Sequence, residues 1–175
     1  MHQVALVSIL GPDKVGLVSD IADCLFSAGI NLRDTHFAAM GEGAEFSAVC
    51  ELPDGLDLAE LRHALLAVPS LAAAEIRVLP YPFDHRAGPK ERITHRIEVS
   101  GGDQLGLIAR LAEIFAQYGA NIVRLDAQKL PESEGGRYVT RFAVSLPAAQ
   151  AEICLASVDS TAGVLGLSCT VEAQG

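Results

Sequence analysis

The sequence predicts an α+β protein made of two copies of one small unit, each a four-stranded antiparallel sheet with two helices on one face. Three observations support this prediction: an internal repeat, the same order of apolar patterns in both halves, and a proline-rich segment between them. The chain has 175 residues, of which 50% are hydrophobic and 20% charged. That length and composition provide enough apolar side chains for two small cores.

The repeat is found when the chain is compared with itself at the shift that lays Gly11 on Gly101. Over residues 11–31, seven positions are then identical, and most of the others keep their character. Unrelated segments of this length share far fewer identities, so we interpret the two halves as products of a duplication. The identical pairs are Gly11/Gly101, Asp13/Asp103, Gly16/Gly106, Leu17/Leu107, Ala22/Ala112, Gly29/Gly119 and Asn31/Asn121.

The first copy begins with a β-branched and aliphatic run at residues 4–10, which predicts a strand. A glycine-containing turn follows, and an apolar stripe at i, i+3, i+4 and i+7 then predicts a helix. Gly29 stands where a C′ glycine ends such a helix. A hairpin is expected next, from 32–39 through a turn into 45–52. The helical stripe consists of Val18, Ile21, Ala22 and Leu25.

The first copy ends with a second helix and a last strand. Asp57 and Glu60 have the spacing of a capping box, which predicts a helix start near residue 57. Leu58, Leu61, Leu65 and Leu66 supply its apolar face. The last strand is expected at residues 75–79.

The second copy offers the same elements in the same order. Its first strand, 96–99, alternates so that Ile97 and Val99 share the buried face. The first helix carries a stripe of Ile108, Leu111, Ala112 and Phe115 and ends near Gly119. The remaining strands and helix are expected at 122–129, 138–146, about 148–156 and 168–171.

The order β-α-β-β-α-β, found twice, is that of the ferredoxin-like split βαβ arrangement. We therefore predict domains at residues 1–80 and 94–175, joined by a semi-rigid linker at 81–93, because the segment 80–89 contains three prolines. Val4 and Leu6, on the outward face of the first strand, are apolar. Small units bury surface inefficiently, so the copies should pack on each other or on a second chain, either edge to edge or face to face.

Charge and composition exclude several classes of protein. The formal net charge is -9, which disfavours direct binding to a nucleic acid backbone. No apolar run approaches the ~20 residues that span a bilayer, and residues 1–3 lack a basic secretory n-region, so we expect a cytoplasmic protein without membrane contact. The cysteines, Cys24, Cys50, Cys154 and Cys169, are widely spaced, which is typical of reduced thiols in a core.

Motifs for chemistry are missing from the sequence. We find no nucleophile elbow, no Ser/His/Asp set, no phosphate-binding loop and no cofactor fingerprint. The histidines have no metal-ligand spacing. The sequence therefore predicts no catalytic residue, no metal site and no cofactor, and an enzyme would need a constellation of scattered residues.

The turns at residues 11–16 and 101–106 are the first candidate site. Their glycines allow a ligand to approach the backbone, and the following helix start offers N–H donors and a positive dipole end for a carboxylate. The alternative is a tight structural turn in which Asp13 or Asp103 caps the helix.

Asn31 and Asn121 are the second candidates, because a side-chain amide can bind both the carboxylate and the ammonium group of an amino acid. Alternatively, asparagine is there because it tolerates the backbone near a helix end. We expect each turn to lie near the asparagine of its own copy, with a crevice beside them. Asp34 and His36 share a face of the second strand, but the other copy has Arg124 and Asp126 there, so a ligand role would not be common to both copies.

The segment from Leu6 to Val18, followed by a helix and by residues 28–32, resembles the start of an ACT domain, a small-molecule regulatory module. The second copy matches through its glycines, Asp103 and Asn121. Two ACT domains without an attached catalytic or DNA-binding domain resemble the glycine cleavage system transcriptional repressor group. The resemblance extends from Val4 to about Glu172.

The resemblance implies binding of an amino acid or similar metabolite where ACT domains meet, through the turn after the first strand and the start of the second. The second copy departs from the first by having Gly102 for Pro12 and Gln104 for Lys14. The implied ligand-binding residues are Gly11, Pro12, Asp13, Gly16 and Asn31 in the first copy and Gly101, Asp103, Gly106 and Asn121 in the second.

The resemblance further implies a non-catalytic regulator that senses an amino acid such as glycine and modulates transcription or metabolism through a protein partner. In the repressor group that partner is a DNA-binding transcription factor, which agrees with an acidic chain that does not bind nucleic acid itself. ACT domains would pair within one chain or in a homodimer. The alternatives are a ligand-independent assembly module and a fragment related to formyltetrahydrofolate hydrolases, which begin with a similar segment.

Overall fold

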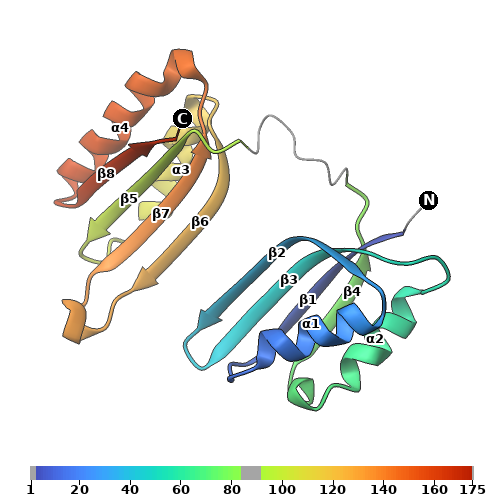
Figure 1. Cartoon of the computed structure of the whole chain (residues 1–175). Coiled ribbons are helices and arrows are strands. Elements are labelled where there is room, and N and C mark those ends of the chain that lie inside the picture. The colour runs from blue at the N-terminus through green and yellow to red at the C-terminus, as the bar shows by residue number, and fades with distance from the viewer. Residues whose placement is uncertain (1–2, 84–91, 175) are drawn as a thin grey trace. The chain divides into compact units, whose positions relative to one another are not determined.

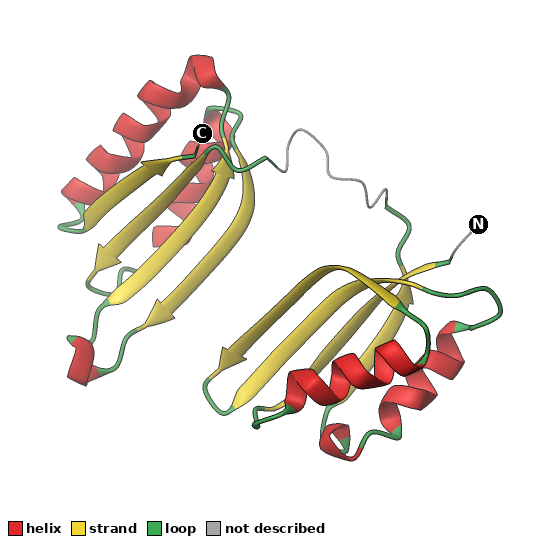
Figure 2. Cartoon of the chain, in the orientation of Figure 1, coloured by secondary structure: helices red, strands yellow, loops and turns green. Residues whose placement is uncertain are grey.

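The computed structural model describes residues 3–83 and 92–174. The chain divides into two compact units, 1–85 and 86–175. In each unit, two helices cover one face of a four-stranded sheet and leave the other face, called here the open face, without helices (Figures 1 and 2). The predicted linker, 81–93, lies mostly outside the described residues.

The first unit has the β-α-β-β-α-β order that its sequence predicts. Its strands lie in the order β2-β3-β1-β4, and neighbouring strands are antiparallel. A short 3-10 turn at Pro69–Leu71 precedes the last strand. The elements are β1 (Val4–Pro12), α1 (Leu17–Ser27), β2 (Asn31–Met40), β3 (Gly43–Glu51), α2 (Leu58–Leu66) and β4 (Glu75–Pro80).

The second unit repeats this topology, with strand order β6-β7-β5-β8. Two 3-10 turns, at Glu132–Glu134 and Ala148–Gln150, lie in its connections. The prediction of two ferredoxin-like units is confirmed. The elements are β5 (His95–Gly101), α3 (Leu107–Gln117), β6 (Asn121–Lys129), β7 (Tyr138–Ser145), α4 (Ala151–Val164) and β8 (Ser168–Ala173).

The core of the first unit follows from strand alternation. Ala5, Val7 and Ile9 of β1 are buried beneath the helices, and the residues between them lie on the open face. The stripe of α1 differs from the prediction: Leu17 is buried, whereas Val18 is 42% exposed. The helix begins directly after the turn, at Leu17, so the buried stripe starts one residue earlier than the sequence pattern indicated.

The second core contains the pair Phe115 and Phe142, whose ring centroids are 5.2 Å apart. Its last helix, α4, follows directly on the 3-10 turn at Ala148–Gln150 and continues to Val164, so the predicted end near residue 156 is wrong. Cys154, Val158 and Ala162 continue one buried stripe along it at i, i+4 and i+8. The helix therefore continues until the chain reaches Gly166, which has φ +68°.

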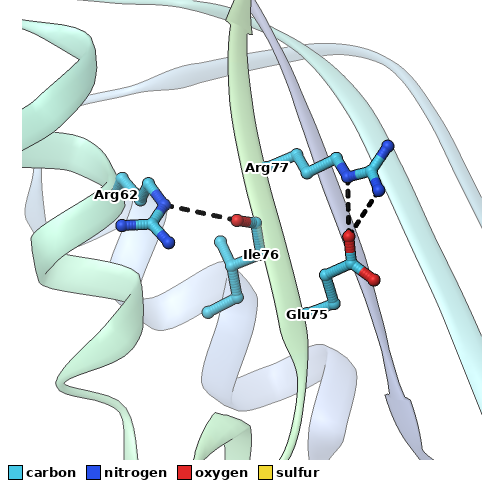
Figure 3. A network of polar contacts seen from close by, with 4 residues as sticks. All are labelled: Arg62, Glu75, Ile76 and Arg77. Carbon is cyan, nitrogen blue, oxygen red and sulfur yellow. Dashed lines mark hydrogen bonds and ion pairs between the residues drawn. The ribbon is translucent and has the colours of Figure 1, made fainter.

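The start of α2 has the capping box that the sequence predicts. At α2, the Glu60 N–H donates to Asp57 Oδ1 at 2.8 Å and the Asp57 N–H donates to Glu60 Oε2 at 3.1 Å, which completes the capping box. Further along α2, Arg62 Nε donates to the carbonyl of Ile76 on β4 at 3.4 Å (Figure 3). This contact connects the helix to the edge strand of its sheet.

The four cysteines are free thiols. Cys50 and Cys154 are buried, as expected of core residues, and Cys24 and Cys169 are partly buried. Burial raises the pKa of all four thiols, that of Cys50 from 9.0 to about 11. The folded protein therefore favours the protonated thiol.

This burial predicts a loss of stability at alkaline pH. The unfolded chain ionises its thiols near pH 9, below the pKa of Cys50 in the folded state. The stabilising contribution of Cys50 to the free energy of unfolding is therefore complete below pH 9, and it is lost as pH rises toward about 11. Urea unfolding between pH 7.5 and 10.5 measures this change. The control is Cys50→Ala, for which the free energy of unfolding should fall less steeply with pH. An equally steep fall in that variant would contradict the assignment.

Candidate ligand site

The turns between the first strand and first helix have the same conformation in both units. Gly16 and Gly106 stand immediately before α1 and α3, with φ +88° and +80°. In this left-handed region other residues are strained, which explains a glycine at both positions. After them, the N–H groups of Leu17 and Leu107 donate at 3.2 Å to carbonyls three residues earlier in each turn.

Neither helix start is capped by a side chain. The alternative in which Asp13 or Asp103 caps the helix is therefore wrong, because the glycine occupies the N-cap position. The Asp13 N–H instead donates to the carbonyl of Glu42 at 2.9 Å and connects the turn to the β2–β3 hairpin. The next N–H groups, those of Val18 and Ser19 in α1 and of Ile108 and Ala109 in α3, are consequently available to an anion or to solvent.

Gly11 and Gly101 have a packing role that the sequence did not reveal. A Cβ at Gly11 would lie 2.8 Å from the Cβ of Ala74, and one at Gly101 would collide with Cδ2 of Leu167, the end of a longer and more flexible side chain. Both glycines therefore allow the segment before the last strand to approach the end of the first strand. At Gly11, where the neighbour is the short side chain of Ala74, this contact explains the glycine without a ligand.

Each turn also carries a fully exposed aliphatic side chain. Val15 in the first unit and Leu105 in the second are at equivalent positions, and neither side chain is covered by its unit. Each turn thus combines uncapped N–H groups with an apolar surface.

Asn31 begins β2, and its Nδ2 donates to Glu51 Oε2 at 3.2 Å. Glu51 also pairs with Arg33, and the hydrogen bond and charge of Glu51 raise the pKa of Arg33. Asn121 begins β6 opposite Ser145. Each asparagine therefore lies at the first position of an edge strand, next to the end of the adjacent strand.

The structure does not bring the turn and the asparagine of one unit together. Asn31 pairs with Glu51 at one end of β3, whereas Pro12 pairs with Gly43 at the other. At ~3.3 Å per residue, this register separates them by roughly 26 Å. The expectation of a shared crevice within one copy is therefore wrong. Helix α1 connects the two motifs and runs along the sheet, so it delivers them to opposite ends.

The second unit shows the same separation. Asn121 pairs with Ser145, and Gly101 pairs with Tyr138 at the other end of β7. Hollows are instead found on the open faces, with volumes of about 350 Å³ on the second sheet and about 270 Å³ on the first. Neither is lined by the predicted turn or asparagine residues.

Arg96 is one of the residues that line the larger hollow. Arg96 belongs to β5 and therefore lies outside the predicted linker. The signal that could have found this hollow is the alternation of charged and apolar residues along β5.

Within residues 3–83 and 92–174, the structure lacks two features that are typical of other protein classes. No helix there is both long and apolar enough to cross a membrane. No group of three or more His, Cys, Asp or Glu side chains there is arranged to hold a metal ion.

The first unit matches a known protein family. The family model of the ACT domain matches residues 3–78, which include every strand and helix from β1 through α2 and most of β4. The first unit is an ACT domain. Because the second unit has the same topology, the chain has a tandem ACT-like architecture, as the repeat predicts.

Solved structures share this architecture. An unknown protein from Galdieria sulphuraria is 22% identical, with a TM-score of 0.76 over 100% of both chains. A protein assigned as a glycine cleavage system transcriptional repressor is 16% identical, with a TM-score of 0.63 over 98% of this chain and 97% of the other. At these identities the similarity shows the fold. No curated protein matches the chain.

Proposed function

We propose that this tandem ACT protein is a regulator that acts by binding, and that it senses an amino acid such as glycine. The match of residues 3–78 to the ACT domain carries this proposal, because such domains serve as small-molecule regulatory modules. The similarity in fold to a protein assigned as a glycine cleavage system transcriptional repressor supports glycine as the first ligand to test.

The chemistry of the turns supports a carboxylate ligand. The first-turn N–H groups of α1 and α3 lie at the positive end of a helix dipole and have no side-chain cap. Val15 and Leu105 beside them are apolar and exposed. We infer that the turn is covered when the ligand is bound, because covering would bury these side chains and exclude water from the N–H groups.

A ligand that contacts both the turn and the asparagine needs two ACT domains, because one unit holds them at opposite ends of its sheet. A second copy of the chain offers the required asparagine. A ligand that binds between two copies has a higher affinity for the associated chains than for the separate chains, so its binding would favour association. A coupling of ~1–3 kcal/mol is enough for a useful switch.

We propose that a protein partner reads this change, with a DNA-binding transcription factor as the leading candidate. The formal net charge of -9 disfavours direct binding of this chain to DNA. The role is then indirect, since the chain changes the activity of its partner.

Calorimetry of the full chain with glycine and the other common amino acids tests this function. We expect saturable binding that is about tenfold or more weaker in Asn31→Ala or Asn121→Ala, because each variant loses a hydrogen bond to a charged ligand group. Gln150→Ala is the matched control, since it removes an exposed amide from the N-cap of α4, where the side chain makes no capping bond. No binding across the amino-acid panel would contradict the proposal.

A second candidate function is ligand-independent assembly. The exposed Val15 and Leu105 favour it, because apolar side chains at two equivalent positions suit a protein interface. If the chain assembles through these turns alone, Val15→Ser and Leu105→Ser should weaken self-association measured by sedimentation, and the asparagine variants should leave it unchanged.

A further inference from the structure

The open face of the second sheet contains a charged groove with a volume of about 350 Å³. Ile97 and Val99 of β5 point into the core, so the residues that alternate with them point to the open face. We call the hollow the β5–β8 groove, since strands β5, β6, β7 and β8 all contribute to it. Its charged lining consists of Arg96, Glu98, Arg124, Asp126, Arg141 and Glu172.

Strand register places two arginines on either side of a small residue. Ala143 of β7 pairs with Arg124 of β6 on one side and with Arg96 of β5 on the other. Neighbouring strands are ~4.8 Å apart, so the Cα atoms of the two arginines lie roughly 10 Å apart. The methyl group of Ala143 leaves the space between them open and forms part of the lining of the groove.

The arginines of the groove differ in their contacts. In the adjacent row, Arg141 Nε donates to Glu98 Oε2 at 2.8 Å. Arg96 and Arg124 make no hydrogen bond or ion pair with any described residue. A guanidinium group presents a planar fork of N–H donors that matches a carboxylate, so two such groups beside an open space suit that anion.

The groove also offers carboxylates. Asp126 lies two residues beyond Arg124 on the same face of β6, and Glu172 of β8 pairs with Arg96 of the neighbouring strand β5. Three arginines and three acidic residues line the groove, so its formal charge is balanced. A balanced lining disfavours a polyanion such as nucleic acid and favours a ligand that carries both charges.

The first unit lacks the two arginines at the equivalent positions, and Asp34 and His36 stand at those of Arg124 and Asp126. Leu6 occupies the place of Arg96, and it pairs with Val49 on one side and Leu79 on the other. The fold therefore does not require an arginine at this position, because the sister unit builds the same sheet with Leu6 in its place. The charged groove is a property of the second unit.

We propose that the β5–β8 groove binds a small zwitterion whose carboxylate lies between Arg96 and Arg124 and whose amino group contacts Asp126. The volume of about 350 Å³ is within the ~300–1,000 Å³ range of small-molecule sites. The groove does not include the turns or the asparagines, so this proposal is independent of the function proposed above.

The test is an NMR titration of the ¹⁵N-labelled full chain with 4-aminobutyrate, which carries a carboxylate and an amino group at opposite ends. Succinate and 1,4-diaminobutane, each with one kind of charge, are the comparison ligands. We expect 4-aminobutyrate to give saturable chemical-shift changes at residues 96–98, 124–126 and 141–143. Each comparison ligand should bind with an affinity that is lower by about tenfold or more. An absence of saturable shifts, or shifts confined to other residues, would overturn the proposal.

Two variants separate charge from shape. Arg96→Gln should weaken binding of 4-aminobutyrate about tenfold, and Ala143→Leu should abolish it by filling the groove while leaving every charge in place. Arg77→Gln is the matched control, because Arg77 lies on the open face of the first sheet, paired with Glu75 (Figure 3). Unchanged affinity in Arg96→Gln would overturn the proposal. Because Arg96 is exposed, this variant tests the proposal even if Ala143→Leu fails to fold.

Discussion

Replacing Phe142 by alanine is expected to destabilise the second unit by about 3–5 kcal/mol, the usual cost of truncating a buried phenylalanine. The Phe142 side chain is 1% exposed and packs against Phe115, which is fully buried. The truncation removes apolar contact area and leaves a cavity that these neighbours fill only partly. It also removes the aromatic pair from the centre of the core.

The loss should be confined to one unit. The two hydrophobic cores consist of separate sets of residues, one from each unit. Denaturant unfolding, followed by residue-resolved NMR, should show Phe142→Ala moving the transition of residues 92–174 and leaving that of residues 3–83 in place. Phe46→Ala, in the first core, should show the reverse. If either variant shifts both transitions equally, the units do not unfold separately.

Replacing Gly11 by alanine is expected to destabilise the first unit by about 1–3 kcal/mol, as for other overpacked sites. The new Cβ would lie 2.8 Å from the Cβ of Ala74, which is closer than real Cβ contacts. The φ of Gly11 is not in the left-handed region, so backbone strain adds nothing to this cost. The measured loss would therefore report the steric contact alone.

A double variant makes the test specific. Ala74→Gly removes the atom that collides, so Gly11→Ala with Ala74→Gly should recover most of the stability that Gly11→Ala loses. Gly102→Ala is the control, because a Cβ there meets nothing within 4 Å and its φ is also not left-handed. Equal losses in Gly11→Ala and Gly102→Ala, measured by urea unfolding, would contradict the steric explanation.

The glycine contacts change how the repeat is interpreted. Close packing against Ala74 accounts for Gly11, and a positive φ accounts for the identity of Gly16 and Gly106, so both are needs of the fold. The duplication thus preserved residues that the sheet and the turn require. On the open face, where the fold needs no particular residue, the units diverged into an apolar surface around Leu6 and a charged groove around Arg96.

The sequence by itself determined the duplication, the order of strands and helices, the capping box at Asp57 and the buried face of the first strand in each copy. These features are local, because they follow from the periodicity of a strand or helix and from the residues at its ends. Only the tertiary structure decided that Pro12 and Asn31 lie at opposite ends of one sheet and that Arg124 and Arg96 flank Ala143. The reason is that register and strand order set which distant residues become neighbours, and no periodicity within one strand specifies them.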